Sequence, residues 1–543
     1  MPDMVNVPLS HQSSPWKRIR YVAQHWYTTR WKAVLASFLC VSLTLTLFPS
    51  AALADDTSEV PSTQSYIDRV AESITEFTLD NGMRFIVMER HQAPIISFMT
   101  YVNVGGAEEE DGKTGAAHYL EHLAFKGTSQ IGTNNYEAEQ QVFKRLDDLF
   151  AQIKTAEAAG DTQTVEHLQA QFQAAKEEAA SYVNQNEFGK IVEQAGGIGL
   201  NATTSADATR YFFDLPSNKL ELWMSLESER FLDPVFREFY EEKEVILEER
   251  RMRTENSPVG RMVEAFLEKA LPGYPYGRPV IGYEDDLRDM TREDIATFFE
   301  TYYTPDRMII AIVGDVDTEN VKQLAETYFG RFPKRISPPL LNPSLPVQTE
   351  TQEITLELAS EPWHWEGFHR PPITDPDNQV YQAIASLLVD GRTSRLYQSL
   401  IEKEQLALDV GIANSFPGDR FSNLFLLYAP TAPGHTVEDV AAAMDAELER
   451  LKTEPISEQE LDRLKTQARA NLLRLLASND GMAMLLPEYE AKTGSWMNLF
   501  EELKAIEAIT AEDIQRVAQT MFRPENLTIG RILPLPDEED SSS

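Results

Sequence analysis

His118, Glu121 and His122 form the pattern H-x-x-E-H, which places three groups suited to metal and acid–base chemistry within five positions. If this segment is helical, the three side chains lie on one face, because residues three and four apart are neighbours on a helix. Two imidazoles one turn apart can bind one metal ion, and a carboxylate beside a metal-bound water can act as its general base. The pattern is the reverse of the H-E-x-x-H zinc motif. The plain alternative is a polar helix face that carries two ordinary histidines.

The acidic run of residues 241–249 offers the best candidate for a third metal ligand. A catalytic zinc site needs three protein ligands and one open position for water. On a helix, Glu242 and Glu249 stand two turns apart on one face, so Glu249 could bind the metal while Glu242 orients a ligand histidine. A solvated acidic helix face explains the same run, and composition alone favours that explanation.

Strand-like segments on both sides of the motif indicate that its helix packs behind a sheet. Asp80-Asn81-Gly82 is a turn signal between two apolar segments, which predicts a β-hairpin. Residues 95–104 are a second apolar strand candidate, and residues 308–313 read as a buried strand. Residues 138–183 differ from these: apolar residues recur at helical spacing on both sides of Gly160, which predicts an inserted helical hairpin. A rigid structural arm is a simpler role for this insert than catalysis.

An internal repeat predicts two homologous lobes. Six identical residues recur at one constant offset of 219 positions (510 − 291), beginning with Thr291 and Thr510. Each copy reads as a capped helix, an aromatic-x-Pro turn and an apolar strand. Five prolines between 333 and 346 mark the connection between the copies. We therefore expect an α+β protein of two homologous α/β lobes, at 71–332 and 351–535, joined by a Pro-rich linker at 333–350.

Composition and the chain ends indicate an exported, acidic protein. Residues 1–54 carry five Lys or Arg, then 16 residues without a charge and Ala52-Leu53-Ala54, which predicts a cleaved signal peptide. An uncleaved membrane anchor is the alternative; after cleavage we expect no integral membrane span and a periplasmic or secreted protein. Cleavage also removes Cys40, so disulfides and thiolate ligands are excluded, and the net charge becomes 44 − 85 = −41. This charge argues against nucleic acid as a partner. We expect a flexible linker at 55–70 and a disordered acidic tail at 536–543.

The chain resembles the pitrilysin and mitochondrial-processing-peptidase family of zinc metallopeptidases, the inverzincins, over nearly all of the part after the signal. The resemblance rests on these segments: Gly115–His122 with Phe125–Thr128, Asn201-Ala202 with Thr204, Glu242–Glu249, Pro275-Tyr276-Gly277, and Ser394–Tyr397. It implies that the two lobes form a clamshell, with the helical hairpin inserted in the first lobe, and that the chain is a bacterial, processing-peptidase-like exported member.

The resemblance also implies the roles of individual residues. His118, His122 and Glu249 would hold one Zn²⁺ per chain, with Glu242 as the supporting glutamate and Glu121 as the general base. Asn201 and Ala202 would bind the substrate as an added strand at a sheet edge. The expected activity is zinc-dependent endopeptidase cleavage of peptides or unfolded segments.

The second lobe departs from the family pattern. It has no H-x-x-E-H, and the positions where active members carry an Arg and a Tyr are Ile401 and Leu408. Neither side chain can donate a hydrogen bond to an oxyanion. Arg395 and Tyr397 belong to another family segment, for which we expect a structural role. We therefore hypothesise that this chain is the zinc-bearing subunit of a heterodimer whose paralogous partner carries the Arg/Tyr pair. The alternative function is a non-catalytic binding or assembly subunit that uses the lobes and the hairpin as an interaction surface.

Overall fold

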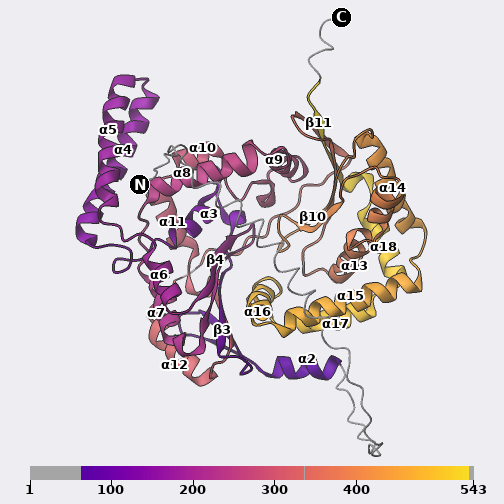
Figure 1. Ribbon diagram of the computed structural model, residues 1–543, viewed down its shortest axis with the longest axis horizontal. Helices are drawn as coiled ribbons and strands as arrows, with labels where there is room; N and C mark the ends of the chain where they lie inside the picture. Colours follow the sequence, from indigo (N-terminus) through magenta and orange to yellow (C-terminus); the bar gives the residue numbers. More distant parts are fainter. Residues whose placement is uncertain (1–62, 336, 537–543) are drawn as a thin grey trace, which may run out of the picture. The chain divides into compact units, whose positions relative to one another are not determined.

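The computed structural model describes residues 63–335 and 337–536 (Figure 1). The expected signal peptide, the first half of the expected linker and the tail from 537 onward lie outside these residues. The remainder of the expected linker is not flexible coil, because α2 (Thr63–Glu72) is a helix. Ile67 and Val70, 1% and 8% exposed, bury its apolar side in a core that contains residues of the second lobe. None of the helices in the described part of the chain is both long enough and apolar enough to span a membrane.

The first lobe is built on a six-stranded sheet with the order β1-β2-β6-β3-β5-β4. Its strands are β1 (Ile74–Thr78), β2 (Arg84–Glu89), β3 (Ile95–Val102), β4 (Ile198–Thr204), β5 (Thr209–Pro216) and β6 (Met308–Gly314). β1 and β2 pair antiparallel, as the turn at Asp80–Gly82 predicts, while β2 and β6 are parallel. β4 is the last strand in this order and pairs with β5.

The central strand β6 is buried at all of its positions because both faces of the sheet are covered. Ile310 and Ile312 face a core formed with helices of the first lobe. Ile309, Ala311 and Val313 face the opposite core, which is completed by helices of the second lobe. The first lobe contributes these helices: α3 (Ala116–Leu123), α6 (Glu187–Gln194), α7 (Leu220–Leu232), α8 (Phe239–Arg250), α9 (Pro258–Ala270), α10 (Glu284–Asp289), α11 (Arg292–Tyr302) and α12 (Thr318–Tyr328).

The second lobe repeats the topology of the first. Its sheet has the order β7-β11-β8-β10-β9, which corresponds to β2-β6-β3-β5-β4. The strands are β7 (Gln352–Leu358), β8 (Trp363–Arg370), β9 (Gly411–Phe416), β10 (Asn423–Pro430) and β11 (Leu527–Pro534). β7 and β11 form a parallel pair, like β2 and β6. The predicted two-lobed α+β fold is therefore confirmed.

The helices of the second lobe include the second copy of the sequence repeat. They are α13 (Asn378–Val389), α14 (Val437–Thr453), α15 (Glu458–Ala477), α16 (Asn479–Thr493), α17 (Asn498–Ala508) and α18 (Ala511–Met521). α11 and α18 both begin with a capping box, formed by Thr291 with Asp294 and by Thr510 with Asp513. The predicted linker contains no helix or strand at residues 333–335 and 337–350.

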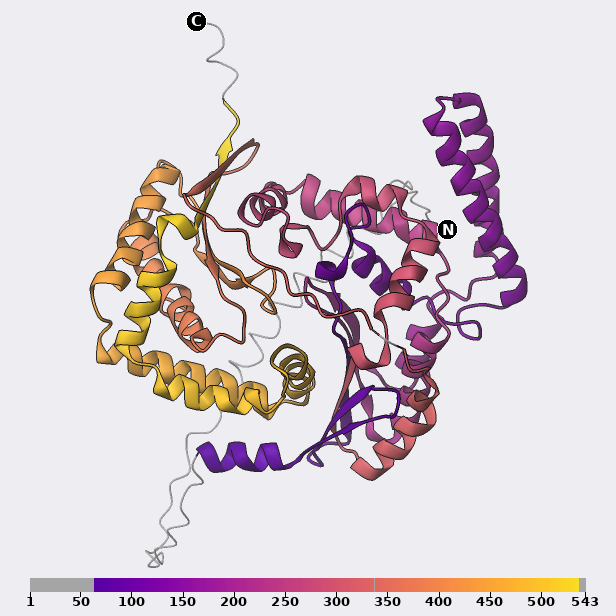
Figure 2. The ribbon, with the colours of Figure 1, turned by 180° about the vertical axis from the view of Figure 1, so that it is seen from behind.

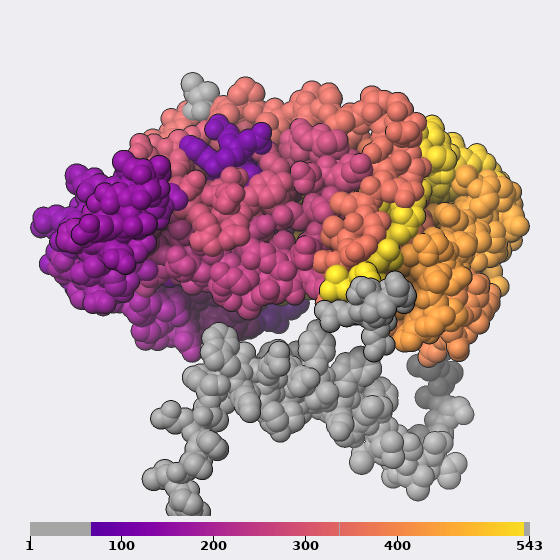
Figure 3. Space-filling view, turned by 90° about the horizontal axis from the view of Figure 1, so that it is seen from above, coloured from indigo at the N-terminus to yellow at the C-terminus, as the bar shows by residue number. Residues whose placement is uncertain are grey.

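The predicted helical hairpin consists of α4 (Tyr136–Ala158) and α5 (Thr162–Ala180). The helices lie side by side and project from the first lobe (Figures 1 and 2), and the space-filling view shows them packed together beside the rest of that lobe (Figure 3). Gly160 takes a φ of +68° in the turn, a conformation that glycine adopts without strain. Phe150 and Phe172 anchor the hairpin by packing against Tyr240 of α8.

Candidate functional site

The H-x-x-E-H segment forms helix α3, and its first turn is held by a buried carboxylate. Glu109 accepts hydrogen bonds from the backbone N–H groups of Gly115 (2.9 Å) and Ala117 (2.8 Å), two donors that have no partner within the helix. Burial raises the pKa of Glu109 to about 8, although these hydrogen bonds oppose the shift. Tyr119 and Leu123 bury the opposite side of α3 in the core of the first lobe. The side of the helix that carries His118, Glu121 and His122 is thereby turned toward α8 and β4.

The structure brings His118, His122 and Glu249 together, as the sequence predicts. The Oε2 atom of Glu249 lies 3.8 Å from His118 Nε2 and 3.5 Å from His122 Nε2. In a tetrahedral site with bonds of about 2.0–2.1 Å, ligand atoms stand about 3.3 Å apart. All three ligand atoms lie within 4.8 Å of one another, and in residues 63–335 and 337–536 this is the group found able to hold a metal ion. Two histidines and one glutamate are a donor set that suits zinc.

Glu242 supports the second histidine from the other side of its ring. Its Oε2 lies 3.0 Å from Nδ1 of His122, which leaves Nε2 of that ring facing Glu249. The other oxygen of Glu242 pairs with Lys126 Nζ at 2.5 Å, and Lys126 also contacts Glu238 at 2.9 Å. Both glutamates of the acidic run therefore point into this site, and the alternative of a solvated acidic face does not hold for them.

The two histidines have opposite preferences for protonation. Burial lowers the pKa of His118 to about 4, and the neighbouring His122 adds to the effect. Burial also disfavours a proton on His122, but its hydrogen bonds with Glu242 and Glu249 outweigh burial and raise its pKa to about 9. The hydrogen bond with His122 in turn lowers the pKa of Glu249.

The side chain of Glu121, on α3, points toward the edge strand β4. Thr204 at the end of β4 donates a hydrogen bond of 2.5 Å to Glu121 Oε2. Burial raises the pKa of Glu121, and the bond from Thr204 opposes the shift. Along β4 the side chains alternate: Ala202 is buried, whereas Asn201 points to solvent. Both predicted substrate-binding residues thus lie on the strand that contacts the general-base candidate.

Two further residues, Thr204 and Arg253, contact the site although the sequence assigns neither of them a role. Thr204 stands in the segment with Asn201 and Ala202, but its contact with Glu121 spans 83 positions. Arg253 pairs with Glu249 Oε1 at 2.7 Å, while Oε2 of the same carboxylate faces the two histidines. In the sequence, only the i,i+4 spacing of Glu249 and Arg253 indicates this contact. Arg253 lies on a single π-helical turn (Arg251–Glu255) that follows α8. Such turns are frequent at functional sites.

The second lobe provides no hydrogen-bond donor at the positions of the family's Arg/Tyr pair. Ile401 lies in the π-helical turn Tyr397–Lys403 and packs against the core of the second lobe. Leu408 is 58% exposed. Arg395 pairs with Glu460 of α15 at 3.0 and 3.3 Å, which fits the structural role expected for it.

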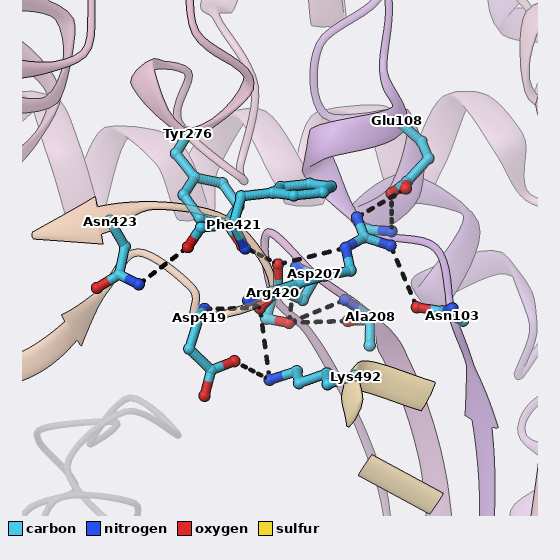
Figure 4. A network of polar contacts seen from close by, with 12 residues as sticks. Asn103, Glu108, Asp207, Ala208, Tyr276, Asp419, Arg420, Phe421, Asn423 and Lys492 are labelled. Atoms are coloured by element: carbon cyan, nitrogen blue, oxygen red, sulfur yellow. Dashed lines mark hydrogen bonds and ion pairs between the residues drawn. The ribbon is translucent and has the colours of Figure 1, made fainter. Parts of the chain in front are cut away.

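A buried polar network joins the second lobe to the segments that carry the site (Figure 4). Arg420, in the loop between β9 and β10, donates hydrogen bonds to Asn103 and Glu108 of the first lobe. Asp207, in the turn between β4 and β5, accepts hydrogen bonds from the backbone of Asp419 and Arg420. Lys492 of α16 also contacts Asp207, at 3.4 Å.

Two family models match the chain. Residues 84–144 and 178–284 match the model described as insulinase (peptidase family M16), and residues 289–468 match the model described as the peptidase M16 inactive domain. The chain belongs to peptidase family M16. The residues between 144 and 178, which the M16 model does not match, lie in the α4–α5 hairpin, so the hairpin is an insertion relative to that model.

M16 relatives that carry the name zinc protease match most of the chain. Zinc protease PqqE of Helicobacter pylori is 28% identical over 467 residues, which cover 85% of this chain and 92% of that protein. The uncharacterized zinc protease YmxG of Bacillus subtilis is 23% identical over 456 residues, which cover 83% of this chain and 96% of that protein. Membership of M16 and these names support a zinc-using peptidase that acts on peptides.

Solved M16 structures share the two-lobed fold. A protease from Helicobacter pylori, 26% identical, matches with a TM-score of 0.71 over 85% of this chain and 99% of that chain. The periplasmic protease PqqL from Escherichia coli, 18% identical, matches with a TM-score of 0.64 over 85% of this chain but 48% of its own. The present chain therefore has the fold of about one half of PqqL.

Proposed function

We propose that this protein is an exported zinc-dependent endopeptidase that cleaves peptides or unfolded segments. His118, His122 and Glu249 hold one Zn²⁺ per chain, Glu242 orients His122, and Glu121 is the general base. The observation that carries this proposal is the convergence of two imidazole Nε2 atoms on Glu249 Oε2, at 3.8 and 3.5 Å, beside an additional carboxylate on the same helix face. A vestigial site has no reason to retain Glu121.

When bound, zinc supplies a Lewis acid that makes a coordinated water acidic near neutral pH. Glu121 accepts the proton of the attacking water and then returns it to the leaving amine of the cleaved peptide. Thr204 holds the Glu121 carboxylate by a hydrogen bond, which fixes the direction of this proton transfer. Glu242 keeps His122 turned so that Nε2 faces the metal position.

The substrate adds to the free edge of β4, next to Asn201 and Ala202. An edge strand presents unpaired backbone N–H and C=O groups, which an extended peptide can pair with. β4 is the last strand of its sheet in the described part of the chain, and Thr204 links it to Glu121. A scissile bond on such an added strand would lie beside the general base.

The active enzyme is a dimer with a paralogous subunit that carries the missing Arg/Tyr pair. Two observations support this part of the proposal. The corresponding positions of this chain are Ile401 and Leu408, which cannot stabilise an oxyanion. The chain also matches 48% of the PqqL chain, which agrees with a second half supplied by a partner subunit. Export rests on the signal-like residues 1–54, and the name of PqqL as a periplasmic protease agrees with it.

Hydrolysis of an unstructured, fluorescence-quenched peptide tests the activity. The metal is removed from the purified protein with a chelator, and zinc is then returned in steps. We expect cleavage to stop on removal and to return as zinc reaches one ion per chain. A protein that binds zinc but cleaves nothing, alone and with proteins that co-purify from its native envelope, would favour the assembly subunit instead.

The same assay tests the partner. We expect the chain alone to be weakly active and to gain turnover on addition of a co-purified paralogue. Full turnover by the chain alone would contradict the heterodimer.

A further inference from the structure

Arg420 of the second lobe reaches into the first lobe and is almost fully buried there. Its Nη2 donates to Glu108 Oε1 at 2.7 Å and its Nη1 donates to Asn103 Oδ1 at 3.1 Å. Its Nε lies 3.8 Å from Asp207. The exposed fractions of the side chains are 9% for Arg420 and 2% for both Glu108 and Asp207. One guanidinium thus bridges three polar side chains of the other lobe (Figure 4).

Glu108 leads directly to the metal-binding helix. It belongs to the short helical turn η1 (Gly106–Glu108), and its second oxygen accepts a hydrogen bond from the Gly105 N–H at 2.9 Å. The next residue, Glu109, holds the N-terminal turn of α3. A shift of Glu108 therefore moves the residue that fixes the start of the helix bearing His118 and His122.

Asp207 is connected to β4, the strand proposed to bind the substrate, through the turn in which it lies. It stands three positions after Thr204, in the turn that joins β4 to β5. This turn is bonded to η1, because Gly106 N–H and Ala107 N–H donate to the carbonyls of Ser205 and Ala206 at 3.1 and 2.9 Å. The helix side and the strand side of the site are thus joined at one place, and Arg420 contacts both.

The loop that carries Arg420 is shaped for this contact. A Cβ at Gly418 would lie 2.7 Å from Asp207 Oδ2, so only glycine allows the loop to approach so closely. Asp207 Oδ2 then accepts the backbone N–H groups of Asp419 at 2.9 Å and Arg420 at 3.2 Å. Tyr276 of the first lobe accepts from the Phe421 N–H at 3.2 Å and donates to Asp207. The loop is fixed at several points, so the direction of Arg420 is determined.

We propose that Arg420 is a positioning residue through which the second lobe holds the metal-binding helix and the substrate strand in register. The lobe that matches the M16 inactive domain then has a defined task in its own chain, in addition to closing the core of the first lobe. Arginine suits this task because its rigid planar fork holds Nη1 and Nη2 in a fixed geometry toward Asn103 and Glu108, whereas a lysine ammonium is a compact point charge without such a fork.

Hydrogen exchange measured by mass spectrometry tests the proposal on the intact protein. Arg420→Met is compared with Arg395→Met, because the Arg395 side chain is equally buried at 9% exposure but pairs with Glu460 inside the second lobe. In Arg420→Met we expect exchange at least tenfold faster in residues 105–123 and 201–209. In Arg395→Met we expect wild-type rates there. Equal exchange in both variants, or acceleration spread over the whole chain, would overturn the proposal.

Zinc affinity, measured by competition with a chromophoric chelator, is the second readout. We expect Arg420→Met to bind zinc about tenfold more weakly and Arg395→Met to bind it as the wild type does. This readout rests on the proposed function, whereas hydrogen exchange does not, so a protein that binds no zinc leaves the exchange test intact.

Arg420→Lys covers the case in which Arg420→Met does not fold, because the lysine keeps the buried charge and loses the fork. We expect the same local acceleration of exchange at smaller amplitude. Wild-type exchange in a folded Arg420→Lys protein would contradict the need for a guanidinium at this position.

Discussion

Replacement of Glu242 by glutamine isolates the contribution of the residue behind His122. Glu242 Oε2 lies 3.0 Å from His122 Nδ1, and its Oε1 lies 2.5 Å from Lys126 Nζ. Glutamine preserves the shape of the side chain but offers one acceptor atom where the carboxylate offers two. Lys126 keeps Glu238 as a partner at 2.9 Å, so the change leaves no buried cation alone. The one amide oxygen goes to the charged Lys126, so the NH₂ end of the glutamine faces His122 Nδ1 and the ring of His122 loses its acceptor.

The magnitude follows from the bond that is lost. A hydrogen bond to a charged group contributes about 1.5–3 kcal/mol, and loss of a group that orients a metal-ligating histidine lowers metal affinity by about 10- to 100-fold, or about 1.4–2.7 kcal/mol. We therefore expect Glu242→Gln to bind zinc about 10- to 100-fold more weakly than the wild type. The two estimates cover nearly the same range of free energy.

Competition with a chromophoric chelator measures this affinity at one fixed pH. Glu241→Gln is the matched control, because Glu241 precedes Glu242 on α8 but pairs with Lys176 of the hairpin at 3.5 Å. We expect the control to bind zinc with wild-type affinity. Equal affinities for Glu242→Gln and the wild type would refute the reasoning, since Glu242 would then not orient the histidine.

Two further predictions concern the surroundings of the site. Burial opposes ionisation of Glu460, but its hydrogen bonds, with that from Arg395 the largest, lower its pKa to about 2. This stabilisation is fully present above the pKa of about 4.3 that glutamate has in the unfolded chain, and it is lost as the pH falls below that value. Because Glu460 is partly exposed, we expect Glu460→Gln to lower the free energy of unfolding by only about 1 kcal/mol at pH 7. The decrease should be smaller at pH 4, and urea unfolding measures both values. A deficit that grows on acidification would contradict this sign. A Cβ at Gly260 would lie 1.9 Å from the carbonyl oxygen of Arg253, whereas none of the protein's described atoms lies within 4 Å of one at Gly330. Gly260→Ala should therefore destabilise the protein by about 1–3 kcal/mol, whereas Gly330→Ala should leave the stability unchanged. Equal melting temperatures of the two variants would contradict this prediction, because the π-helical turn would then adjust to the added methyl group without loss of stability.

The part of the site that depends on local spacing could be predicted from the sequence. His118, Glu121 and His122 share a helix face because a helix brings residues three and four apart together. The same rule places Glu242 and Glu249 on one face of α8, but it does not say that this face meets α3. The residues alone left a solvated acidic surface open, and the family resemblance was needed to favour Glu249.

Contacts between distant segments account for what the sequence did not predict. Thr204 meets Glu121 across 83 positions, and Arg420 meets Glu108 across 312. Neither contact produces a periodic pattern in the sequence, because each contact depends on how the two sheets and their loops pack. The expectation of a flexible segment up to residue 70 failed for the same reason. The apolar side of α2 belongs to a core that also contains second-lobe residues such as Leu472, about 400 positions away in the chain.

The internal repeat shows what a sequence comparison within one chain can establish. Matching residues at Thr291 and Thr510 predicted two similar lobes, and both helices start with the same capping box. The repeat does not predict that the second lobe covers one face of the first sheet. That packing buries Ile309, Ala311 and Val313 of β6 against helices of the second lobe.

Peptide hydrolysis by Glu121→Gln, at a zinc content equal to that of the wild type, tests the central claim most directly. The account predicts that the variant binds one zinc per chain with unchanged affinity and that kcat falls by about 10²- to 10⁴-fold, because the proton acceptor is lost while the three metal ligands remain. A zinc-loaded Glu121→Gln protein that cleaves the peptide at the wild-type rate would contradict the account.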